Sequence, residues 1–543
     1  MRKTIQALSL LLFTAFFLLA TYRLPDWLPA DLYLRIDPLL GINAVIASRE
    51  IIGRVLWSLV LIGLTLAVGR FFCAYVCPLG ATIDGIDFLF FRKGRRPELK
   101  ADLSLRRWKY VLLILIIAAA LTGVSLVYLL DPIALLTRFY TFVLHPLMIA
   151  VTNLLLDLIR PLSRGMGWVG LSHLQVPQSV YYMTVLTLVI FGAVIALGRL
   201  APRFWCRYLC PLGALLSLIS PLGVFRRRVS KACNQCMACR KGCPMGAIGD
   251  DPLSIRSAEC IQCRECAGIC PQKAISFPAS VSGMGEYSGL DLTRRGFVAS
   301  LAGGLTFGFL SLRTPFALLQ GRRQLIRPPG ALPETEFLRT CIRCGECMKS
   351  CATNTLQPSF WGSGSLGLWT PKLELRMAAC EPNCNVCGKV CPTQAIRSLP
   401  LEEKTHAKIG TAVLRKEMCL VWTQNKQCLI CDEICPYNAI VFRPVDGYRR
   451  PVVVASRCNG CGYCEQRCPV GGESAIVVMT DGEIRLKEGS YIAEARKLEL
   501  EFKPDPGDDK FVIDESGFKF EEGEKEKSPP AGQRTPQKPK GFL

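Results

Sequence analysis

The cysteines between residues 233 and 270 constrain the fold of this chain more than any other feature. They read CNQCMACRKGCP and, fifteen residues later, CIQCRECAGICP. In each half, three cysteines are spaced C-x2-C-x2-C, and a fourth stands directly before a proline. Three thiolates at this spacing can wrap one iron–sulfur cube, whereas a zinc site usually has two separated pairs. The pattern therefore predicts two four-iron clusters.

This segment resembles the two-cluster bacterial ferredoxins, in which the fourth ligand of each cluster comes from the other half of the module. The resemblance implies two crossed ligand sets: Cys233, Cys236 and Cys239 with Cys270, and Cys260, Cys263 and Cys266 with Cys243.

Four further quartets of cysteines follow, and the same logic pairs them. The implied sets are Cys341, Cys344 and Cys347 with Cys391; Cys380, Cys384 and Cys387 with Cys351; Cys419, Cys428 and Cys431 with Cys468; and Cys458, Cys461 and Cys464 with Cys435. Cys351, which ends the first of these quartets, is followed by alanine instead of proline, and two other quartets depart in spacing, because one opens with C-x3-C and another with C-x8-C. A three-iron cluster or a shifted potential would be least surprising there. Short apolar runs after the quartets predict strands that cover the clusters.

Composition excludes several other classes of protein. The 28 cysteines of this 543-residue chain are too many and too clustered for a secreted disulfide scaffold, which is normally short. No C-x2-C-H motif is present, so c-type haem is not expected. The three histidines are too few for two bis-histidine haems. The net charge of +21 lies largely beside apolar segments, which is typical of membrane proteins and argues against nucleic-acid binding.

Apolar runs predict a membrane domain at the N-terminal end. Four of them, residues 5–20, 51–69, 110–130 and 180–198, approach the roughly 20 residues that cross a bilayer. With the N-terminus inside, the basic loop after the second run lies in the cytoplasm. Residues 139–159 are apolar but interrupted, and we expect an interfacial or re-entrant helix on the outer side. The expected fold class is an α-helical membrane domain with about four transmembrane helices, plus α+β two-cluster ferredoxin-like modules.

A short repeat follows the second and fourth runs: GRFFCAYVCPLG at residues 69–80 and FWCRYLCPLG at residues 204–213. If the halves meet, Cys73, Cys77, Cys206 and Cys210 could hold one further cluster; the alternative is a redox-inactive set of thiols. Together with the four spans and the first ferredoxin module, these motifs resemble the NapH type of membrane quinol dehydrogenase subunit. The resemblance covers residues 1 to about 280 and implies electron transfer from menaquinol or ubiquinol towards a periplasmic reductase.

Twin arginines at residues 294 and 295 precede a weakly apolar stretch, which resembles a Tat export signal at an internal position. We expect an uncleaved anchor; the alternative is an ordinary helix with basic flanks. With the four later quartets, residues 290–480 resemble the NapG (MauM/NapG) type of periplasmic iron–sulfur subunit. The chain therefore looks like both subunits joined in one polypeptide.

The sequence predicts five parts. They are a membrane domain (1–225), a two-cluster module (226–280), a twin-arginine anchor and linker (281–335), a four-cluster domain (336–500) and a disordered tail (501–543). The resemblances place the chain in the bacterial inner membrane as a multi-pass protein. Four spans with an inside N-terminus put residues 226–280 in the cytoplasm, and the Tat-like and NapG resemblances put residues 336–543 in the periplasm.

The expected function is quinol oxidation, with electrons passing through six [4Fe-4S] clusters to a periplasmic partner such as a multihaem cytochrome or a nitrate-reductase-type enzyme. The alternatives are an assembly factor for a respiratory metalloenzyme and a redox regulator. Candidate residues for handling the quinol protons are His145, Asp131 and Asp84. The membrane itself poses a difficulty, because about 30 Å of hydrocarbon would separate the two sets of clusters without a recognised carrier.

Overall fold

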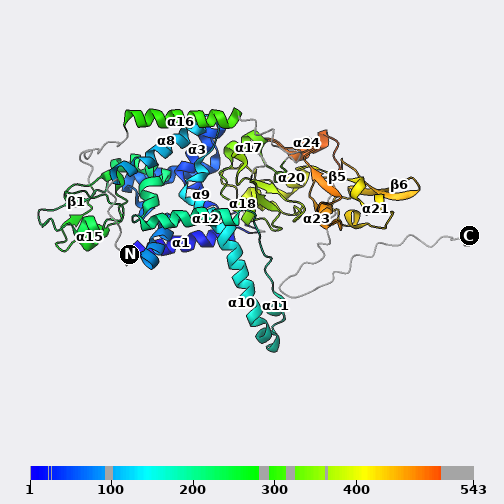
Figure 1. Ribbon diagram of the computed structural model, residues 1–543, viewed down its shortest axis with the longest axis horizontal. Coiled ribbons are helices and arrows are strands. Elements are labelled where there is room, and N and C mark those ends of the chain that lie inside the picture. The colour runs from blue at the N-terminus through cyan, green and yellow to red at the C-terminus, as the bar shows by residue number, and fades with distance from the viewer. Residues whose placement is uncertain are drawn as a thin grey trace, which may run out of the picture.

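Three parts follow one another along the long axis of the molecule in this computed structural model (Figure 1). A helical domain (residues 2–222) lies in the middle. A small cysteine module (residues 226–279) lies at one end, and a large cysteine domain (residues 325–502) lies at the other. The structure describes residues 2–21, 24–25, 27–91, 102–279, 293–313, 325–360 and 365–502. Most of the predicted disordered tail and part of the predicted linker fall outside these residues.

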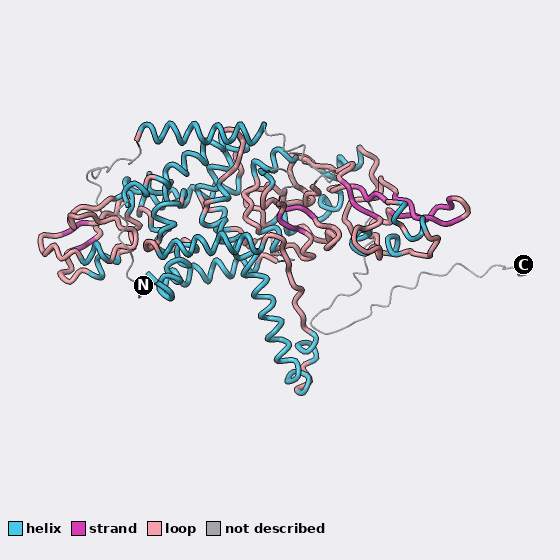
Figure 2. Tube along the Cα trace, in the orientation of Figure 1, coloured by secondary structure: helices cyan, strands magenta, loops and turns pink. Residues whose placement is uncertain are grey.

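The helical domain is built from apolar helices, several of which run along the long axis (Figure 2). The segments that correspond to the four predicted spans are α1 (Arg2–Leu19), α4 (Ser58–Val68), α8 (Trp108–Leu121) and α12 (Thr184–Ala196). The third ends nine residues earlier than predicted. Gly123 has a φ of +87°, and the amide of Val124 donates to the carbonyl of Ala119, which is the glycine-terminated end of a helix.

Four short helices start inside this domain, and each begins with a proline after a capping residue. Asp37 caps α3 (Pro38–Ser48) and Asp131 caps α9 (Pro132–Phe139); Cys77 and Cys210 stand in the same position before α6 (Pro78–Ile86) and α13 (Pro211–Ile219). Proline suits the first helical position because its missing N–H would be unpaired there anyway. Helix α6 contacts α9, and α13 contacts α3. The Cys-Pro and Asp-Pro helices therefore meet pairwise in the interior.

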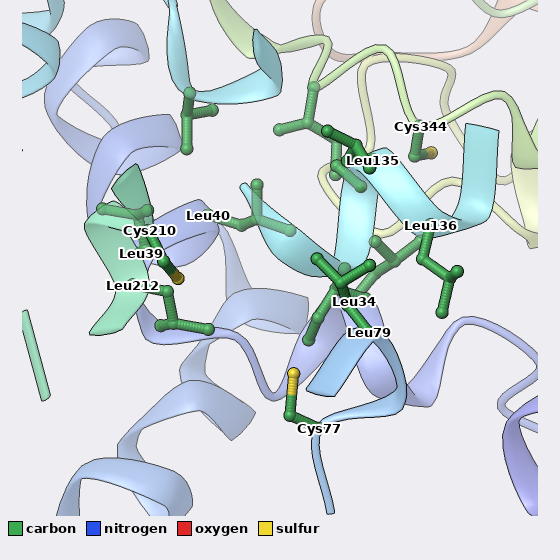
Figure 3. Close-up of a cluster of buried hydrophobic side chains, with 14 of the residues drawn as sticks. Leu34, Leu39, Leu40, Cys77, Leu79, Leu135, Leu136, Cys210, Leu212 and Cys344 are labelled. Carbon is green, nitrogen blue, oxygen red and sulfur yellow. The ribbon is translucent and has the colours of Figure 1, made fainter. Parts of the chain in front are cut away.

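One continuous buried apolar cluster fills the interior of the helical domain (Figure 3). It extends from Cys77 and Cys210 through leucines of α3, α6 and α9 to Cys344, which belongs to the large cysteine domain. Leu39, Leu40 and Leu136 in this cluster are fully buried. The core of the helical domain thus continues as far as the large cysteine domain.

The interrupted segment at residues 139–159 forms neither a break nor a re-entrant turn. A π-helical turn, Tyr140–Leu144, joins α9 to α10 (His145–Gly165), so that Pro132–Gly165 is one helix. By length and composition, this helix and α1 are the two in the described ranges that could cross a membrane. Figure 1 shows α10 projecting from the body across the direction of α1 and α12, with α11 (Val169–His173) at its tip.

The twin arginines begin a helix, α16 (Arg294–Arg313), that lies along the outside of α8 (Figure 1). Close approach depends on a glycine: a Cβ added at Gly304 would lie 2.6 Å from the Cβ of Ala118. Small residues allow this kind of helix contact in membranes. Helix α16 runs from the end of the molecule that carries the small cysteine module towards the large cysteine domain.

Short antiparallel strand pairs close the cysteine-rich parts. In the small module, β1 (Arg228–Val229) pairs with β2 (Ile275–Ser276). In the large domain, β5 (Thr411–Leu414) pairs with β8 (Ile476–Met479) around the last two quartets. Two further pairs lie within halves of that domain: β3 (Leu356–Pro358) with β4 (Pro371–Leu373), and β6 (Ile440–Val445) with β7 (Tyr448–Val453). Strands β6 and β8 lie where the sequence predicted covering strands.

Candidate iron–sulfur sites

Four cavities in the large cysteine domain are each lined by four cysteines. Their volumes are about 360, 370, 380 and 320 Å³. In the same order, the lining cysteines are Cys341, Cys344, Cys347 and Cys391; Cys351, Cys380, Cys384 and Cys387; Cys419, Cys428, Cys431 and Cys468; and Cys435, Cys458, Cys461 and Cys464. The structure thus brings together every crossed set that the ferredoxin resemblance implies for this domain.

The regular C-x2-C-x2-C triplets share a backbone conformation that curves the loop around its cavity. In each C-x2-C-x2-C loop, the residues two and four positions after the first cysteine have positive φ. These pairs are Gln235 and Met237, Gln262 and Arg264, Arg343 and Gly345, and Gly460 and Gly462. Left-handed backbone is costly for non-glycine residues, so a bound cluster would be the compensating interaction. In the C-x8-C quartet, the inserted residues instead form α21 (Leu420–Thr423), and Val421 lines the cavity.

Backbone amides donate hydrogen bonds to several of the sulfurs. The donors are Ala247 to Cys243, Ala274 to Cys270, Ala439 to Cys435, Ile396 to Cys391 and Ala412 to Cys458, with N–S distances of 3.3–3.5 Å. Hydrogen bonds to sulfur are one determinant of cluster potential. Four cysteines around one cavity, apolar walls and N–H donors fit a thiolate-bound four-iron cluster.

The small cysteine module shows the same pairing less completely. Burial raises the pKa of the Cys260 thiol to about 12. The neighbouring thiols of Cys263, Cys243 and Cys266 also raise this pKa, which places these four cysteines close together. Cysteines of both sets, Cys239, Cys243, Cys266 and Cys270, contact one small apolar cluster, and the Arg227 guanidinium lies 3.7 Å from the Cys239 sulfur.

The two Cys-x3-Cys-Pro motifs meet in the helical domain. Burial, together with the adjacent thiols of Cys73 and Cys206, raises the pKa of Cys77 well above its usual value, and Cys210 responds to the same neighbours. The amides of Gly80 and Gly213 donate to the sulfurs of Cys77 and Cys210 at 3.4 and 3.2 Å. We call these four cysteines, Cys73, Cys77, Cys206 and Cys210, the inner quartet. Its donor set fits one cluster in addition to those of the six crossed sets.

Two buried arginines link the halves of the inner quartet, and sequence reasoning missed both. Arg203, from the second motif, donates to the carbonyl of Cys73 in the first motif at 2.8 Å and to Asp84 at 2.7 Å. Arg70, from the first motif, packs against Gly213 of the second, where an added Cβ would lie only 3.1 Å from its guanidinium. Both arginines are about 1% exposed. Each stands three residues before the first cysteine of its motif, so Arg-x2-Cys-x3-Cys-Pro-Leu-Gly was the signal that could have identified them.

The inner quartet lies beside the small cysteine module. Ala74, Met245 and Ile261 form a buried apolar cluster against which Cys73, Cys206, Cys243 and Cys263 pack. A buried ion pair holds the two parts together: Lys109 Nζ lies 2.5 Å from Glu259 Oε1, and Arg106 and Arg70 lie 3.5 and 3.8 Å from Oε2. Burial alone would raise the pKa of Glu259, but these cations lower it below its ordinary value.

At the opposite end, the first cavity of the large cysteine domain rests on the helical domain. Lys349 donates to the carbonyl of Ala20 at 2.8 Å and so caps the end of α1. Arg343 donates to the carbonyl of Ser125 at 2.8 Å and lies 4.0 Å from the centre of the Tyr128 ring. Cys344 itself belongs to the apolar core shown in Figure 3.

The three residues predicted to handle quinol protons lie in different places. Asp131 is fully buried, caps α9 and faces Asp37, another buried carboxyl that the sequence reasoning did not select. The repeated Asp-Pro at the starts of α3 and α9 was the signal for this pair. His145 packs edge-on against Phe17. Asp84 lines a large cavity near the small cysteine module. The structure therefore does not assemble these three into one site.

Comparisons with known proteins agree with the geometry of these sites. A family model described as a 4Fe-4S dicluster domain matches residues 426–472. Another, described as a 4Fe-4S binding domain, matches residues 51–97 and 183–231, which contain the two halves of the inner quartet. No solved structure is significantly similar to the chain. The chain is an iron–sulfur protein of the ferredoxin type.

Relatives among characterised sequences identify the family. The methylamine utilization ferredoxin-type protein MauM of Paracoccus denitrificans is 39% identical over 165 residues, which are 29% of this chain and 72% of MauM. The ferredoxin-type proteins NapG and NapF of Escherichia coli are each 34% identical, over 182 and 156 residues. These stretches are 32% and 28% of this chain, and 78% and 84% of the relatives. The chain belongs to the MauM/NapG family of ferredoxin-type proteins, as the sequence predicted.

Proposed function

We propose that this protein is a membrane-bound electron carrier that oxidises a quinol and delivers the electrons to a periplasmic respiratory acceptor. In this proposal six [4Fe-4S] clusters occupy the crossed cysteine sets and a seventh occupies the inner quartet. Bound clusters supply reversible one-electron transfer. The helical domain acts as a NapH-type membrane subunit that is fused to the MauM/NapG-type part.

The observation that carries the proposal is the arrangement of the cysteine sets along the molecule. The small cysteine module and the large cysteine domain occupy opposite ends of the helical domain (Figure 1), and the inner quartet packs against the small module. An apolar core runs on from Cys77 and Cys210 to Cys344. In this proposal the inner quartet is the intermediate carrier, which is one of the two roles that the sequence left open for these thiols.

Buried polar contacts fix the small cysteine module and the large cysteine domain to the helical domain. Glu259 anchors the small cysteine module among Lys109, Arg106 and Arg70, and Lys349 anchors the large domain at the end of α1. Fusion through α16 keeps the two cysteine-rich parts on one molecule, which gives them a high effective concentration for one another. We place the small module in the cytoplasm and the large domain in the periplasm, because the basic residues cluster around the small module.

Topology reporters test this placement directly. Fusions of alkaline phosphatase and of green fluorescent protein after residues 225 and 335 of the chain are expected to report opposite sides of the membrane. The site after residue 225 should favour fluorescence, and the site after residue 335 should favour phosphatase activity. If both sites reported the same side, α16 would not cross the membrane, and the proposed transfer of electrons from the cytoplasmic to the periplasmic side would be wrong.

A further inference from the structure

One cavity in the described part of the molecule differs from the cysteine-lined ones in size and chemistry. Its volume is about 1530 Å³, part of which is open to solvent, whereas each cysteine-lined cavity has a volume below 400 Å³. Three elements form it: the start of α1, the end of α6 with the adjoining π-helical turn (Asp87–Phe91), and the small cysteine module.

The walls combine an apolar slot with a charged side. Leu10 and Phe88 contribute apolar surface, whereas the polar and charged lining residues are Arg2, Lys3, Gln6, Asp84, Asp87 and Glu265. The Asp84 carboxylate is held by three donors: Arg2 pairs with it, the Gln6 amide donates to it at 2.8 Å, and Arg203 donates to it at 2.7 Å. In a pocket for a small organic ligand, apolar walls hold the ligand and precisely placed polar groups fix its orientation.

Two of the cysteine sets border this cavity. Pro244, which lines it, follows Cys243 directly. On the other side, the Gln6 amide donates to the carbonyl of Ala74 at 2.9 Å, next to Cys73 of the inner quartet. A donor of two electrons bound here would therefore lie near two separate one-electron acceptors.

Exposed apolar side chains directly follow two residues that line the cavity. Leu89 and Phe90 come after Phe88 and are 73% and 75% exposed, and Leu11 comes after Leu10 and is 67% exposed. Exposed aromatic and aliphatic side chains of this size are typical of contact with lipid or an apolar ligand. They provide a route by which a hydrophobic molecule could pass from the bilayer into the cavity.

We propose that this cavity is the quinol-binding site, with the benzene or naphthalene ring in the apolar slot and a ring oxygen facing Gln6 and Asp84. The inference rests on the proposed quinol-oxidising function and assigns it a place. Oxidation of one quinol would break its two O–H bonds and release two protons to water at the cavity; the two electrons would go one each to clusters held by the Cys243 set and by the inner quartet, because bound clusters accept electrons one at a time. Arg2, Gln6 and Arg203 are positioning residues here, because all three fix the Asp84 carboxylate.

A glycine on the cavity wall provides the test. A Cβ added at Gly85 would meet no atom within 4 Å, so Gly85→Trp should fill the cavity without disturbing α6. Gly192→Trp is the matched control, since Gly192 is also an exposed helical glycine with open space around it, but lies on α12. The probe is a short-chain azidobenzoquinone, which is photo-crosslinked to the full-length protein in detergent and mapped by mass spectrometry.

We expect crosslinks on peptides of α1 or α6 in the native protein and in Gly192→Trp, and at least a tenfold weaker apparent affinity in Gly85→Trp. Crosslinks confined to other helices, or equal affinity in Gly85→Trp, would overturn the assignment.

Reduction by menadiol separates the proposed binding site from the proposed quinol-oxidising function. If menadiol reduced the native protein and Gly85→Trp equally, the site would be wrong and the function would stand. If the probe bound as expected but menadiol reduced neither protein, the site would stand and quinol oxidation would be lost.

Discussion

Replacing Cys73 and Cys206 together with alanine is expected to stop electrons from reaching the large cysteine domain. The two residues come from different halves of the inner quartet, so their loss leaves no half with a complete pair of ligands. Even an outer-shell partner of a metal ligand typically contributes about 10- to 100-fold to metal affinity, and direct ligands should contribute more. The variant should lack the iron of one four-iron cluster while retaining that of the other sets.

Two measurements check this result: iron per polypeptide after anaerobic purification, and bleaching of visible absorbance after addition of menadiol. The clusters of the large cysteine domain should stay oxidised in the variant with menadiol but bleach with dithionite. Thr82→Ala is the matched control, because the Thr82 hydroxyl donates only to the Pro78 carbonyl of its own helix, at 2.9 Å. Unchanged iron content and unchanged bleaching in the cysteine variant would show that the inner quartet is merely a set of structural thiols.

Glu259→Gln is expected to detach the small cysteine module from the helical domain. The substitution removes the charge that pairs with Lys109, Arg70 and Arg106, all of which are less than 5% exposed. Removing one partner of a buried ion pair typically costs about 3–5 kcal/mol, because the remaining charge stays buried without compensation. The module should therefore be cut off by protease much faster than in the native protein, and reduction by menadiol should slow.

Two further variants make this prediction specific to the buried pair. Asp250→Asn removes a carboxylate of the same module that pairs with Arg240 at 2.7 Å but is 95% exposed, so protease resistance should hardly change. Adding Lys109→Met to Glu259→Gln should restore part of the resistance, because one of the uncompensated cations is then absent. Equal resistance of Glu259→Gln and Asp250→Asn would mean that the ion pair does not hold the module in place.

The cysteine sets were the part most fully predictable from the sequence, because their spacing is local and their pairing follows one rule. The rule places Cys391 with Cys341 and Cys351 with Cys380, and the structure lines one cavity with each set. The π-helical turn before His145 was not predictable in this way. An interrupted apolar pattern cannot distinguish a broken helix from one that absorbs the interruption in a wider turn.

The residues that position the sites were harder to foresee, because they act between distant segments. Glu259 and Lys109 are 150 positions apart, and the sequence around either residue does not indicate that the two form an ion pair. Arg70 and Arg203 were visible only as members of a repeat longer than the Cys-Pro core. The large cavity arises from three elements that the chain brings together from its start, its first Cys-Pro helix and its small cysteine module.

The most direct test of the relay is anaerobic reduction of the reconstituted full-length protein by menadiol, followed by low-temperature electron paramagnetic resonance. The proposed function predicts signals of reduced clusters from both the small cysteine module and the large cysteine domain. The signals can be assigned by comparison with Cys263→Ala and Cys461→Ala, which each remove one ligand of one set. If dithionite reduced the clusters while menadiol gave no signal from either part, quinol would not be the electron donor, and a role in assembling another metalloenzyme would take its place.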